Sequence, residues 1–418
     1  MNIWIVNPFD PLPGDPEQEG RYATLARLLA GRGHRVVWWT SSFSHRFKRP
    51  VDQVTLRAAC SALGIEVEFL TAPPYYANVS LRRVWNHHVL AQRFVGAART
   101  RTPAPDVVVA SSPPPGLAWR AVEVARARGA RAVVDVQDAW PDVFTTVAPP
   151  VLRPAVQCCL PALRRNVRRI ARACDAIVGV ADGYVDLFAR HARKSQRTAT
   201  IPLGVDLAAF DAAVQRGRSE AHTKPAGEIW LAYTGSLNRS YDFMTILRAA
   251  ARLGADHRPP LRFFLTGRGE LTRQAEELVR AHSLPNVHLT GFLPFDTWAY
   301  LLSQCDIGFN ASLPEAMIYL PNKVFYYLAA GVAVLNTIPG QCSRIVRDGA
   351  CGLDYRAGDP DSCAAAIRQL IGDEARRAAM RAAARRLAER EYDRAVLFPR
   401  YVTLLEELGP RVLPADRT

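Results

Sequence analysis

The sequence lacks the short motifs that assign many proteins to a class at first sight. It contains no GxSxG turn, no HExxH motif, no Walker A loop and no set of protein-kinase motifs. No two cysteines have CxxC spacing, and no cluster of cysteines and histidines has the spacing of zinc ligands. We therefore expect neither a serine hydrolase nor a metalloprotease, and we expect no metal site.

Long hydrophobic runs are also missing. No run reaches the ~18 apolar residues that a membrane-spanning helix needs, so we expect no such helix. The first ten residues lead straight into an expected strand without a basic region, so we expect no signal peptide. The eight cysteines include an adjacent pair, Cys158 and Cys159, and we expect reduced, buried thiols. Such thiols predict a cytoplasmic protein.

Acidic residues are too few to balance the basic ones, and the formal net charge is +14. This charge favours a polyanionic partner, such as nucleic acid, an anionic membrane or a phosphate-bearing substrate. We do not expect nucleic acid, because no nucleic-acid-binding motif accompanies the charge. Residues 80–101 and 160–174 mix arginine and histidine with large apolar residues at helical spacing. Residues 80–101 predict either an interfacial helix on an anionic membrane or a core-packed helix with a basic solvated side.

What the sequence does contain is a regular alternation of short apolar runs and helical stretches, which predicts βαβ units and parallel sheets. We expect strands at residues 2–7, 35–40, 65–70, 106–110, 131–136, 176–180, 198–202, 229–233, 261–266, 286–289, 307–310, 333–335 and 352–355. The polar stretch 204–224 interrupts them and predicts an interdomain connector. We therefore expect two α/β domains with a cleft between them. Residues 374–408 are expected to be nearly all helix, with a kink or break at Pro399.

The stretch 321–331, PNKVFYYLAAG, carries the leading site prediction. Asn322 is placed to cap a helix that begins at Lys323, and Gly331 is placed to end it. A short strand follows, and Gln341 begins a second helix. Two helix N-termini at neighbouring strand ends favour an anionic group, because their unpaired N–H groups and dipoles attract it. The alternative is an ordinary βαβ unit.

Two loops that contain glycine are further candidates for phosphate binding. Gly235 and Arg239 follow the first strand of the second half, where glycine permits close approach and arginine supplies charge. Gly14 and Gly20 bracket the first long loop, and Gly20 stands at a helix start. The first loop is not GxGxxG, which argues against a nicotinamide-binding domain. An exposed loop is the alternative in both cases.

Polar side chains also follow two strands of the first half. Residues 135–142, DVQDAWPD, bring acids to a strand's carboxyl end, where Asp138 could accept a hydrogen bond from a sugar hydroxyl. Residues 41–45, SSFSH, follow the second strand, and His45 is a candidate acid, base or hydrogen-bond donor. The alternatives are a capping aspartate beside a core tryptophan, and a surface histidine.

These segments together resemble the GT-B-fold glycosyltransferases of the large retaining family 4, over nearly the whole length. The resemblance is carried by residues 31–36 (GRGHRV), 201–206 (IPLGVD), 233–237 (YTGSL), 264–269 (FLTGRG), 321–323 (PNK), 329–331 (AAG), 347–349 (RDG) and 351–353 (CGL). Residues 41–45 and 137–142 look most like the branch that includes the fucosamine transferases of O-antigen and capsule assembly.

The resemblance implies an α/β protein of the GT-B fold, with two Rossmann-like domains whose parallel sheets face each other across a cleft. It places an acceptor-binding domain at residues 1–205, a nucleotide-sugar-binding domain at 206–390, and a helix that packs back on the first domain at 391–418. It implies transfer of a sugar, with retention, from a nucleotide diphosphate sugar to a glycan acceptor, which we expect to be lipid-linked. We expect no metal or other cofactor, and a cytoplasmic enzyme that is peripheral to the inner face of the plasma membrane.

By position, the resemblance places Gly235, Arg239 and Lys323 at the donor diphosphate, and Asp138 near the donor sugar or the acceptor hydroxyl. The remaining candidates are His45 for catalysis and Gly20, Asn322, Tyr326 and Gln341 for donor binding.

The chain departs from the family pattern at several positions. Two family glutamates are replaced by Ile318 and Tyr326, and a third by Gln341. The arginine that normally follows Gly235 is Ser236. The second glutamate would hold the nucleotide ribose by two hydrogen bonds, whereas Tyr326 could offer one hydrogen bond and a ring for stacking. A catalytically silent GT-B protein that binds a partner transferase or a glycan is therefore an alternative, and a sugar-nucleotide epimerase is a third.

Overall fold

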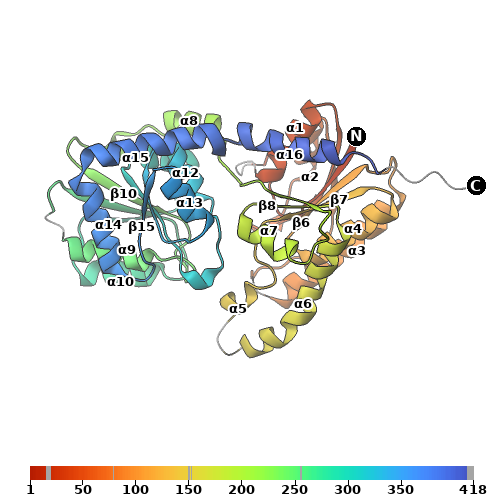
Figure 1. Ribbon diagram of the computed structural model, residues 1–418, viewed down its shortest axis with the longest axis horizontal. Helices are drawn as coiled ribbons and strands as arrows, with labels where there is room; N and C mark the ends of the chain where they lie inside the picture. Colours follow the sequence, from red (N-terminus) through yellow and green to blue (C-terminus); the bar gives the residue numbers. More distant parts are fainter. Residues whose placement is uncertain (16–19, 79, 149–150, 152, 255–256, 412–418) are drawn as a thin grey trace, which may run out of the picture. The chain divides into compact units, whose positions relative to one another are not determined.

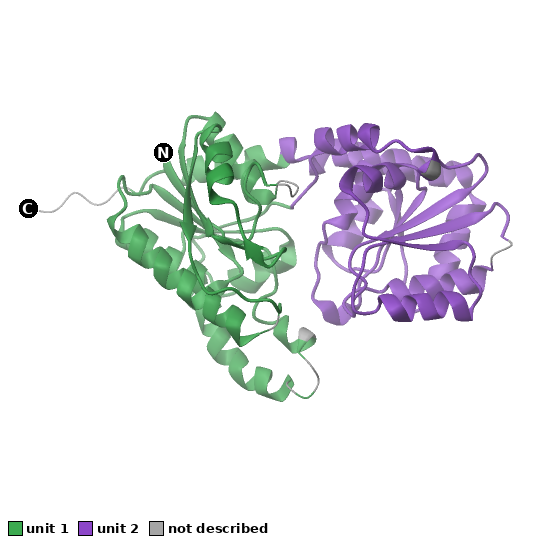
Figure 2. Ribbon diagram, turned by 180° about the vertical axis from the view of Figure 1, so that it is seen from behind, with its two compact units in different colours: residues 1–202, 397–418 green, residues 203–396 purple. Residues whose placement is uncertain are grey.

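The computed structural model describes residues 1–418 except 16–19, 79, 149–150, 152, 255–256 and 412–418. The chain divides into two compact units (Figure 2). The first unit contains residues 1–202 and the chain from Leu397 onward, and the second contains residues 203–396. Each unit has its own parallel sheet with helices packed against it, so the predicted α/β class is confirmed (Figure 1).

The first unit is built on a seven-stranded parallel sheet with the order β5-β2-β1-β6-β7-β8-β9. Its strands are β1 (Asn2–Val6), β2 (Arg35–Ser41), β5 (Ile65–Leu70), β6 (Val107–Ser112), β7 (Arg131–Val136), β8 (Ala176–Gly179) and β9 (Arg197–Thr200). Its helices are α1 (Arg21–Gly31), α2 (Gln53–Ser61), α3 (Leu81–Thr100), α4 (Pro115–Ala127), α5 (Phe144–Val147), α6 (Arg153–Ala173) and α7 (Asp182–Ala189). The central strands β1 and β6 are buried along their whole length, as expected for a parallel sheet covered on both faces.

The second unit is built on a six-stranded parallel sheet with the order β12-β11-β10-β13-β14-β15. Its strands are β10 (Ile229–Thr234), β11 (Leu261–Thr266), β12 (Val287–Gly291), β13 (Ile307–Asn310), β14 (Ala333–Asn336) and β15 (Gly352–Asp354). Its helices are α8 (Leu207–Arg216), α9 (Phe243–Leu253), α10 (Thr272–Ala281), α11 (Phe295–Ser303), α12 (Lys323–Ala329), α13 (Gln341–Asp348), α14 (Pro360–Gly372) and α15 (Glu374–Leu387).

Every predicted strand is present in these two sheets, in the predicted order along the chain. The strands β5, β7, β11 and β13 also have the predicted ends. Two features differ from expectation. The short strands β3 (Phe43–Ser44) and β4 (Arg49–Pro50) form a hairpin where we expected no strand. The polar connector contains α8, which Asp206 caps by accepting a hydrogen bond from the Ala209 N–H at 2.8 Å. The connector is therefore largely a folded part of the second unit.

The C-terminal tail is helical, as predicted, through α15, the π-helical turn η4 (Ala388–Tyr392) and α16 (Arg394–Leu408). Pro399 lies inside α16 and does not end it. In the first unit, Tyr401 of α16 donates a hydrogen bond to Asp135 at 3.1 Å, and Asp135 pairs with Arg21 at 2.7 Å. All three side chains are fully buried. This ion pair therefore joins α1, β7 and α16.

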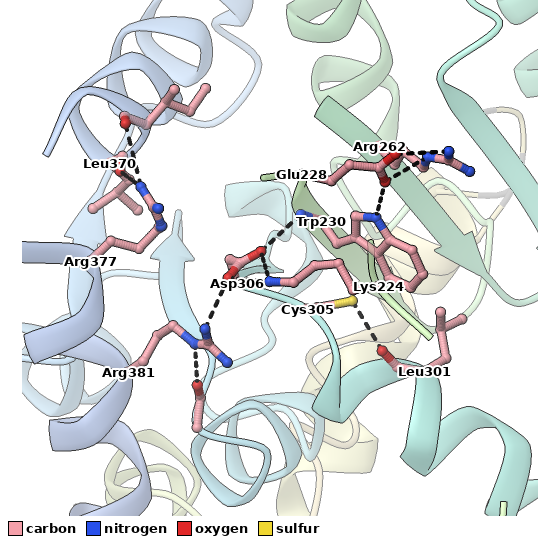
Figure 3. A network of polar contacts seen from close by, with 12 residues as sticks. Lys224, Glu228, Trp230, Arg262, Leu301, Cys305, Asp306, Leu370, Arg377 and Arg381 are labelled. Carbon is pink, nitrogen blue, oxygen red and sulfur yellow. Dashed lines mark hydrogen bonds and ion pairs between the residues drawn. The ribbon is translucent and has the colours of Figure 1, made fainter. Parts of the chain in front are cut away.

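In the second unit, Asp306 forms a comparable polar anchor just before β13 (Figure 3). Its carboxylate accepts hydrogen bonds from Lys224 at 2.7 Å, from the Trp230 backbone N–H at 2.9 Å and from Arg381 at 2.9 Å. The Asp306 side chain is only 5% exposed. One buried carboxylate therefore holds the segment before β10 and helix α15 to the amino-terminal edge of the sheet. Ligands of such folds bind at the opposite edge.

Six of the cysteines are buried, but Cys158 and Cys159 are exposed on α6. The prediction of buried thiols is therefore wrong for these two residues, because the first half of α6 extends beyond the sheet beside α5 (Figure 1). Among the helices that the structure describes, none combines the length and apolar character needed to cross a membrane.

Candidate functional site

The carboxyl end of β10 leads into a glycine turn that is pressed against its neighbour. Gly235 has φ +136° and donates a backbone hydrogen bond to Thr266 at 3.0 Å. Gly267 has φ +140°, and a Cβ added there would lie 1.9 Å from the Gly235 carbonyl oxygen. Only glycine fits both demands, because other residues avoid this conformation and carry a Cβ. The two turns can therefore pack this closely only because both positions are glycine.

Lys323, the first residue of α12, lies beneath this turn. The residue is 6% exposed, and its Nζ lies 4.2 Å from the Tyr233 ring centroid and 4.1 Å from that of Tyr241. A Cβ on Gly235 would be 3.2 Å from Nζ. Nζ has no hydrogen-bond partner among the described residues, and burial lowers the pKa of the ammonium to about 7. Among the described residues, the ammonium therefore contacts two ring faces and has no hydrogen-bond acceptor.

Tyr327, also on α12, fixes the position of Lys323. Its hydroxyl donates a hydrogen bond to the Phe309 carbonyl at 3.1 Å and accepts one from the Thr234 N–H at 3.0 Å. A Cβ on Gly308 would lie 2.8 Å from the Tyr327 ring, so glycine makes room for it. These contacts tie α12 to the carboxyl ends of β10 and β13, and they bring Gly235 and Lys323 together.

Helix α12 begins at Lys323 and ends before Gly331, as predicted, but its predicted side-chain cap is absent. Gly331 has φ +62°, and the N–H groups of Gly331 and Val332 bond back to Leu328 and Tyr327, which closes the helix. Asn322 has helical backbone angles and makes no side-chain capping bond. The prediction that Asn322 caps α12 is therefore wrong, and its side chain is exposed instead.

A buried polar ladder holds the turn that precedes α13. The Asn310 amide donates to Asn336 at 2.8 Å, and the Asn336 amide donates to Asp354 at 2.7 Å. The ladder crosses the carboxyl ends of β13, β14 and β15. Gly340 follows with φ +72°, and Gln341 is the first residue of α13, as predicted. The second predicted helix start is therefore present at the same sheet edge as Lys323.

Arg239 has the exposed environment of the alternative interpretation, and Tyr326 has one that the sequence did not suggest. The Arg239 side chain is 78% exposed and lies 3.4 Å from the Glu270 carboxylate. The Tyr326 ring packs edge-on against Trp298 at 5.0 Å and lies 6.1 Å from the Phe210 ring. Burial raises the pKa of Tyr326. Arg239 therefore already has an acidic neighbour, and Tyr326 is part of an aromatic cluster.

In the first unit, the two candidate catalytic residues are linked through Arg83. The Tyr75 hydroxyl lies 2.5 Å from His45 Nδ1, and the Arg83 guanidinium lies 5.9 Å from the Tyr75 ring centroid. Arg83 in turn interacts electrostatically with Asp138. Asp138 accepts a hydrogen bond from the Ala139 N–H at 2.7 Å, and the Trp140 side chain also interacts with it. His45 and Asp138 therefore belong to one polar cluster.

Aromatic rings surround this cluster. The Arg83 guanidinium lies 5.0 Å from the Trp140 ring centroid and 5.8 Å from that of Phe9. The His87 ring lies 5.5 Å from Phe9 and 5.9 Å from Trp140. His87 Nε2 is buried and has no hydrogen-bond partner within the described chain. The arrangement combines flat apolar rings with a few polar groups, as small-molecule sites commonly do.

Burial sets the protonation of these groups. It lowers the pKa of His45 to about 4 and that of His87 to about 3, and the positive charge of Arg83 adds to both effects. Both imidazoles are therefore neutral near pH 7. Burial also raises the pKa of Asp138, against the opposing effect of its hydrogen bonds and of Arg83. A neutral imidazole and a partly buried carboxylate can each accept a proton.

Gly20 stands at the start of α1, as predicted, but the carboxylate of Asp10 already lies at the N-terminus of this helix. The Asp10 carboxylate accepts a hydrogen bond from the Tyr22 N–H at 3.2 Å, and a Cβ on Gly20 would lie 2.6 Å from it. The small size of Gly20 therefore makes room for Asp10 at the helix N-terminus. The predicted contact of Gly20 with a donor phosphate stays a prediction.

Arg83 and His87 are site residues that sequence reasoning missed. They lie on the inner face of α3 with the buried Leu90 and Phe94, at the spacing of one helical face. That spacing is visible in the sequence, but the interpretation of residues 80–101 rested on their overall charge. Its outer face does carry exposed apolar residues, among them Leu81 at 87% exposure.

No group of three or more His, Cys, Asp or Glu side chains is placed to hold a metal ion in the part of the chain that the structure describes. The expectation of a metal-independent protein stays a prediction.

Both units match known sequence families. Residues 19–204 match the family described as "Glycosyl transferase 4-like domain", and residues 228–373 match "Glycosyl transferases group 1". A comparison with curated protein sequences gave no match.

Solved structures share the fold at low sequence identity. The UDP complex of Alr3699/HepE from Anabaena is 16% identical, with a TM-score of 0.69, over 97% of this chain and 100% of that one. Sucrose-phosphate synthase from Thermosynechococcus elongatus is 17% identical, with a TM-score of 0.70, over 97% and 98%. WaaG, a glycosyltransferase involved in lipopolysaccharide biosynthesis, is 15% identical, with a TM-score of 0.66, over 96% and 99%. The chain therefore carries the paired domains of the GT-B glycosyltransferases, a glycosyl transferase 4-like domain followed by a glycosyl transferases group 1 domain.

Proposed function

We propose that this protein transfers a sugar from a nucleoside diphosphate sugar to a glycan acceptor and retains the anomeric configuration. The observation that carries the proposal is the buried Lys323 ammonium, which has no hydrogen-bond acceptor among the described residues and lies beneath the Gly235 turn. A leaving diphosphate develops negative charge, and a fixed cation in a dry site stabilises that charge strongly. Retention rests on the sequence resemblance to family 4.

For the donor, we assign the diphosphate to Gly235 and Lys323. Lys323 Nζ lies 3.2 Å from the position of a Cβ on Gly235, so a phosphate bound at this turn would supply the acceptor that Lys323 lacks among the described residues. The related Alr3699/HepE was solved with UDP and with UDP-glucose, which supports a nucleotide sugar as the donor class. In this proposal the positive charge at the leaving group comes from the chain itself, without a metal ion.

The other predicted donor contacts remain part of the proposal with different roles. Asn322 and Arg239 have exposed side chains that can reach a ligand, and Gln341 begins α13 at the same sheet edge. Tyr326 is partly exposed, but its ring packs against Trp298. We assign Tyr326 to the nucleoside, as an aromatic surface rather than as a replacement for the two hydrogen bonds of a glutamate.

For the acceptor, we assign the cluster around Arg83 in the first unit. Its rings offer flat surfaces, and Asp138 or neutral His45 can accept the proton of the attacking hydroxyl. The Arg83 guanidinium suits an acceptor that carries phosphate, as a lipid-linked glycan does. WaaG acts in lipopolysaccharide biosynthesis, which supports a surface-polysaccharide pathway. The fucosamine-transferase type rests on the resemblance of residues 41–45 and 137–142, and the location at the inner membrane face rests on the positive net charge.

The test of the donor assignment is binding and turnover with UDP-, GDP- and dTDP-sugars and an extract of lipid-linked acceptors. We expect one donor to bind by calorimetry and to release its nucleotide, with NMR showing the retained anomer. Lys323→Met should weaken that donor by ~1.5–3 kcal/mol, as for a lost hydrogen bond to a charged group. Lys194→Met is the matched control, because Lys194 is exposed in the first unit. If no donor binds, or if both variants bind equally, the assignment fails.

The test of the acceptor assignment is Asp138→Asn. We expect kcat to fall by about 10²–10⁴, as for the loss of a general base, while donor affinity stays unchanged. Asp186→Asn, on the exposed face of α7, is the control and should retain full activity. Equal activity of the two variants would remove Asp138 from catalysis and leave His45 as the candidate base.

A catalytically silent binding protein is the second candidate, and the position of Tyr326 favours it. Tyr326 stands in place of a ribose-holding glutamate and is packed among aromatic rings. In that case a donor or a glycan would bind, but no nucleotide would be released whichever acceptor is supplied. Lys323→Met would also leave the host polysaccharide unchanged.

A further inference from the structure

A pocket of about 390 Å³ lies between α6 and the end of α7, within the first unit. Its lining consists of Pro161, Arg164, Arg168, Arg190 and His191. Three guanidinium groups and an imidazole therefore share one hollow, and neither the donor assignment nor the acceptor assignment uses them.

Helix geometry explains why these groups converge. Pro161, Arg164 and Arg168 are spaced by three and four residues on α6, so they lie along one face. Arg190 is the residue at which α7 ends, and the His191 N–H bonds back to the Phe188 carbonyl at 2.9 Å. The turn after α7 therefore places Arg190 and His191 against that face.

The pocket holds more positive than negative charge. Asp142 is the acid that pairs with it, with Oδ1 2.7 Å from Arg164 Nε and Oδ2 3.8 Å from Arg190 Nη2. Arg168 donates a 3.4 Å hydrogen bond to the Pro161 carbonyl. Because a carbonyl is neutral, this contact does not compensate the charge of Arg168. Helix α6 itself contains no acidic residue. Burial lowers the pKa of His191, the charges of Arg190, Arg168 and Arg172 add to this effect, and Asp142 opposes it.

We propose that this pocket binds the phosphate group of an anionic phospholipid. Guanidinium groups recognise phosphate oxygens by paired hydrogen bonds, and Arg164 and Arg190 remain about half exposed at 48% and 52%. The volume exceeds that of a bare phosphate and accommodates a headgroup. A soluble phosphate would satisfy the same chemistry, and α6 distinguishes the two sources.

The first half of α6 favours the lipid. It extends beyond the sheet beside α5 (Figure 1), and Leu163 is an exposed apolar residue that follows the exposed Cys158 and Cys159. An amphipathic helix with arginines on its polar side and apolar residues at its edge inserts at the headgroup level of an anionic bilayer. The same helix therefore supplies both apolar contact and the phosphate-binding arginines.

The experiment is co-sedimentation of the full-length protein with phosphatidylcholine vesicles that contain or lack phosphatidylglycerol. The double variant Arg168→Gln/Arg190→Gln leaves the Arg164–Asp142 pair in place. Arg273→Gln/Arg280→Gln on α10 removes the same charge from exposed positions in the second unit. We expect wild type and the α10 variant to bind vesicles with phosphatidylglycerol, and the pocket variant to bind at least tenfold more weakly.

Equal binding by the two double variants would overturn the proposal, because net charge alone would then explain attachment. Binding of inorganic phosphate, measured by calorimetry, without attachment to either vesicle would overturn the lipid as the source. The pocket variant should keep the wild-type melting temperature and nucleotide affinity. A loss of vesicle binding with those two properties intact supports the proposal, whether or not the donor assignment holds.

Discussion

Lys323 shows how one residue can be costly for folding and useful for binding. Its ammonium is buried between Tyr233 and Tyr241 without a hydrogen-bond acceptor among the described residues. Burying a cation without a partner lowers stability, and ring faces offset only part of that cost. A diphosphate at the Gly235 turn would supply the missing partner. Binding of an anion there would therefore offset the free-energy cost of burying the Lys323 ammonium.

The first prediction follows from the pKa of Lys323. The folded-state pKa of about 7 lies below the ordinary value of 10.5, so the unfolded chain binds more protons between these values. The contribution of Lys323 to the free energy of unfolding should therefore rise with pH from about 7 to about 10.5. Urea denaturation at pH 6.5 and pH 9 should show a steeper rise for wild type than for Lys323→Met.

Lys194→Met serves as the control and should retain the wild-type slope, because Lys194 is exposed. The same protonation predicts that donor affinity falls with pH above about 7, by up to about tenfold per unit while a charged Lys323 is needed. If the free energy of unfolding depended on pH in the same way for wild type and for Lys323→Met, the ammonium would not be buried in solution.

At the scale of elements, a fully buried ion pair helps to dock α16 in the first unit. Tyr401, Asp135 and Arg21 join three elements of the first unit, and each side chain is fully buried. An acid at the end of a strand is commonly taken as a site residue, but Asp135 serves here as an anchor. Its neighbour Asp138, three residues on, is the acid of the polar cluster.

The second prediction tests this anchor. Tyr401→Phe should lower the free energy of unfolding by about 1–3 kcal/mol, because the buried Asp135 carboxylate loses a donor. Arg21→Met should cost more, about 3–5 kcal/mol, because it leaves a buried charge unpaired. Urea denaturation measures both, and Tyr76→Phe is the control, since Tyr76 is 66% exposed. A cost for Tyr401→Phe no larger than for Tyr76→Phe would contradict the prediction.

The third prediction concerns the close packing of the Gly235 and Gly267 turns at the candidate donor site. Gly267→Ala should weaken donor binding, because the new Cβ would lie 1.9 Å from the Gly235 carbonyl and push that turn away. Gly227→Ala is a matched control: its φ is also positive, at +80°, but nothing lies within 4 Å of the added Cβ.

Both variants should lose about 1 kcal/mol of stability from backbone strain, and Gly267→Ala more than that. Calorimetric titration with the best donor separates the two effects. If Gly227→Ala weakens the donor as much as Gly267→Ala, strain rather than displacement of the turn is responsible.

At the scale of the whole molecule, the two units carry different parts of the proposed reaction. Gly235, Lys323 and the ladder before α13 all belong to residues 203–396, whereas Asp138, His45 and Arg83 belong to the first unit. Each unit presents its residues at the carboxyl ends of its strands, which is where ligands of parallel sheets bind.

The fourth prediction follows from this division. Hydrogen exchange with a saturating nucleoside diphosphate should show protection concentrated in the second unit, around β10 and the start of α12. At a ligand concentration of about 100 times Kd, binding should stabilise the fold by about 2.7 kcal/mol. Lys323→Met should reduce this stabilisation at the same concentration, and Lys194→Met should not. Protection confined to residues 1–202 would place the nucleotide in the wrong unit.

Much of the fold could be predicted because it depends on local patterns. Buried parallel strands are short apolar runs, and β7 and β11 have the predicted ends for this reason. The proximity of Gly235 and Lys323 also followed from the rule that parallel strands end at one edge. By contrast, the role of Asn322 was mispredicted, because capping depends on backbone angles that the residue type does not determine.

The sequence by itself determined the two α/β units and the edge of each sheet at which polar residues gather, because hydrophobic periodicity and glycine turns act over short stretches of chain. Only the tertiary structure decided what those residues do. It enclosed Lys323 between the rings of Tyr233 on β10 and Tyr241, separated Asp135 from Asp138 by burial, and turned Arg83 toward Tyr75. Burial and charge pairing are sums over neighbours from many elements, and no single stretch of sequence contains them.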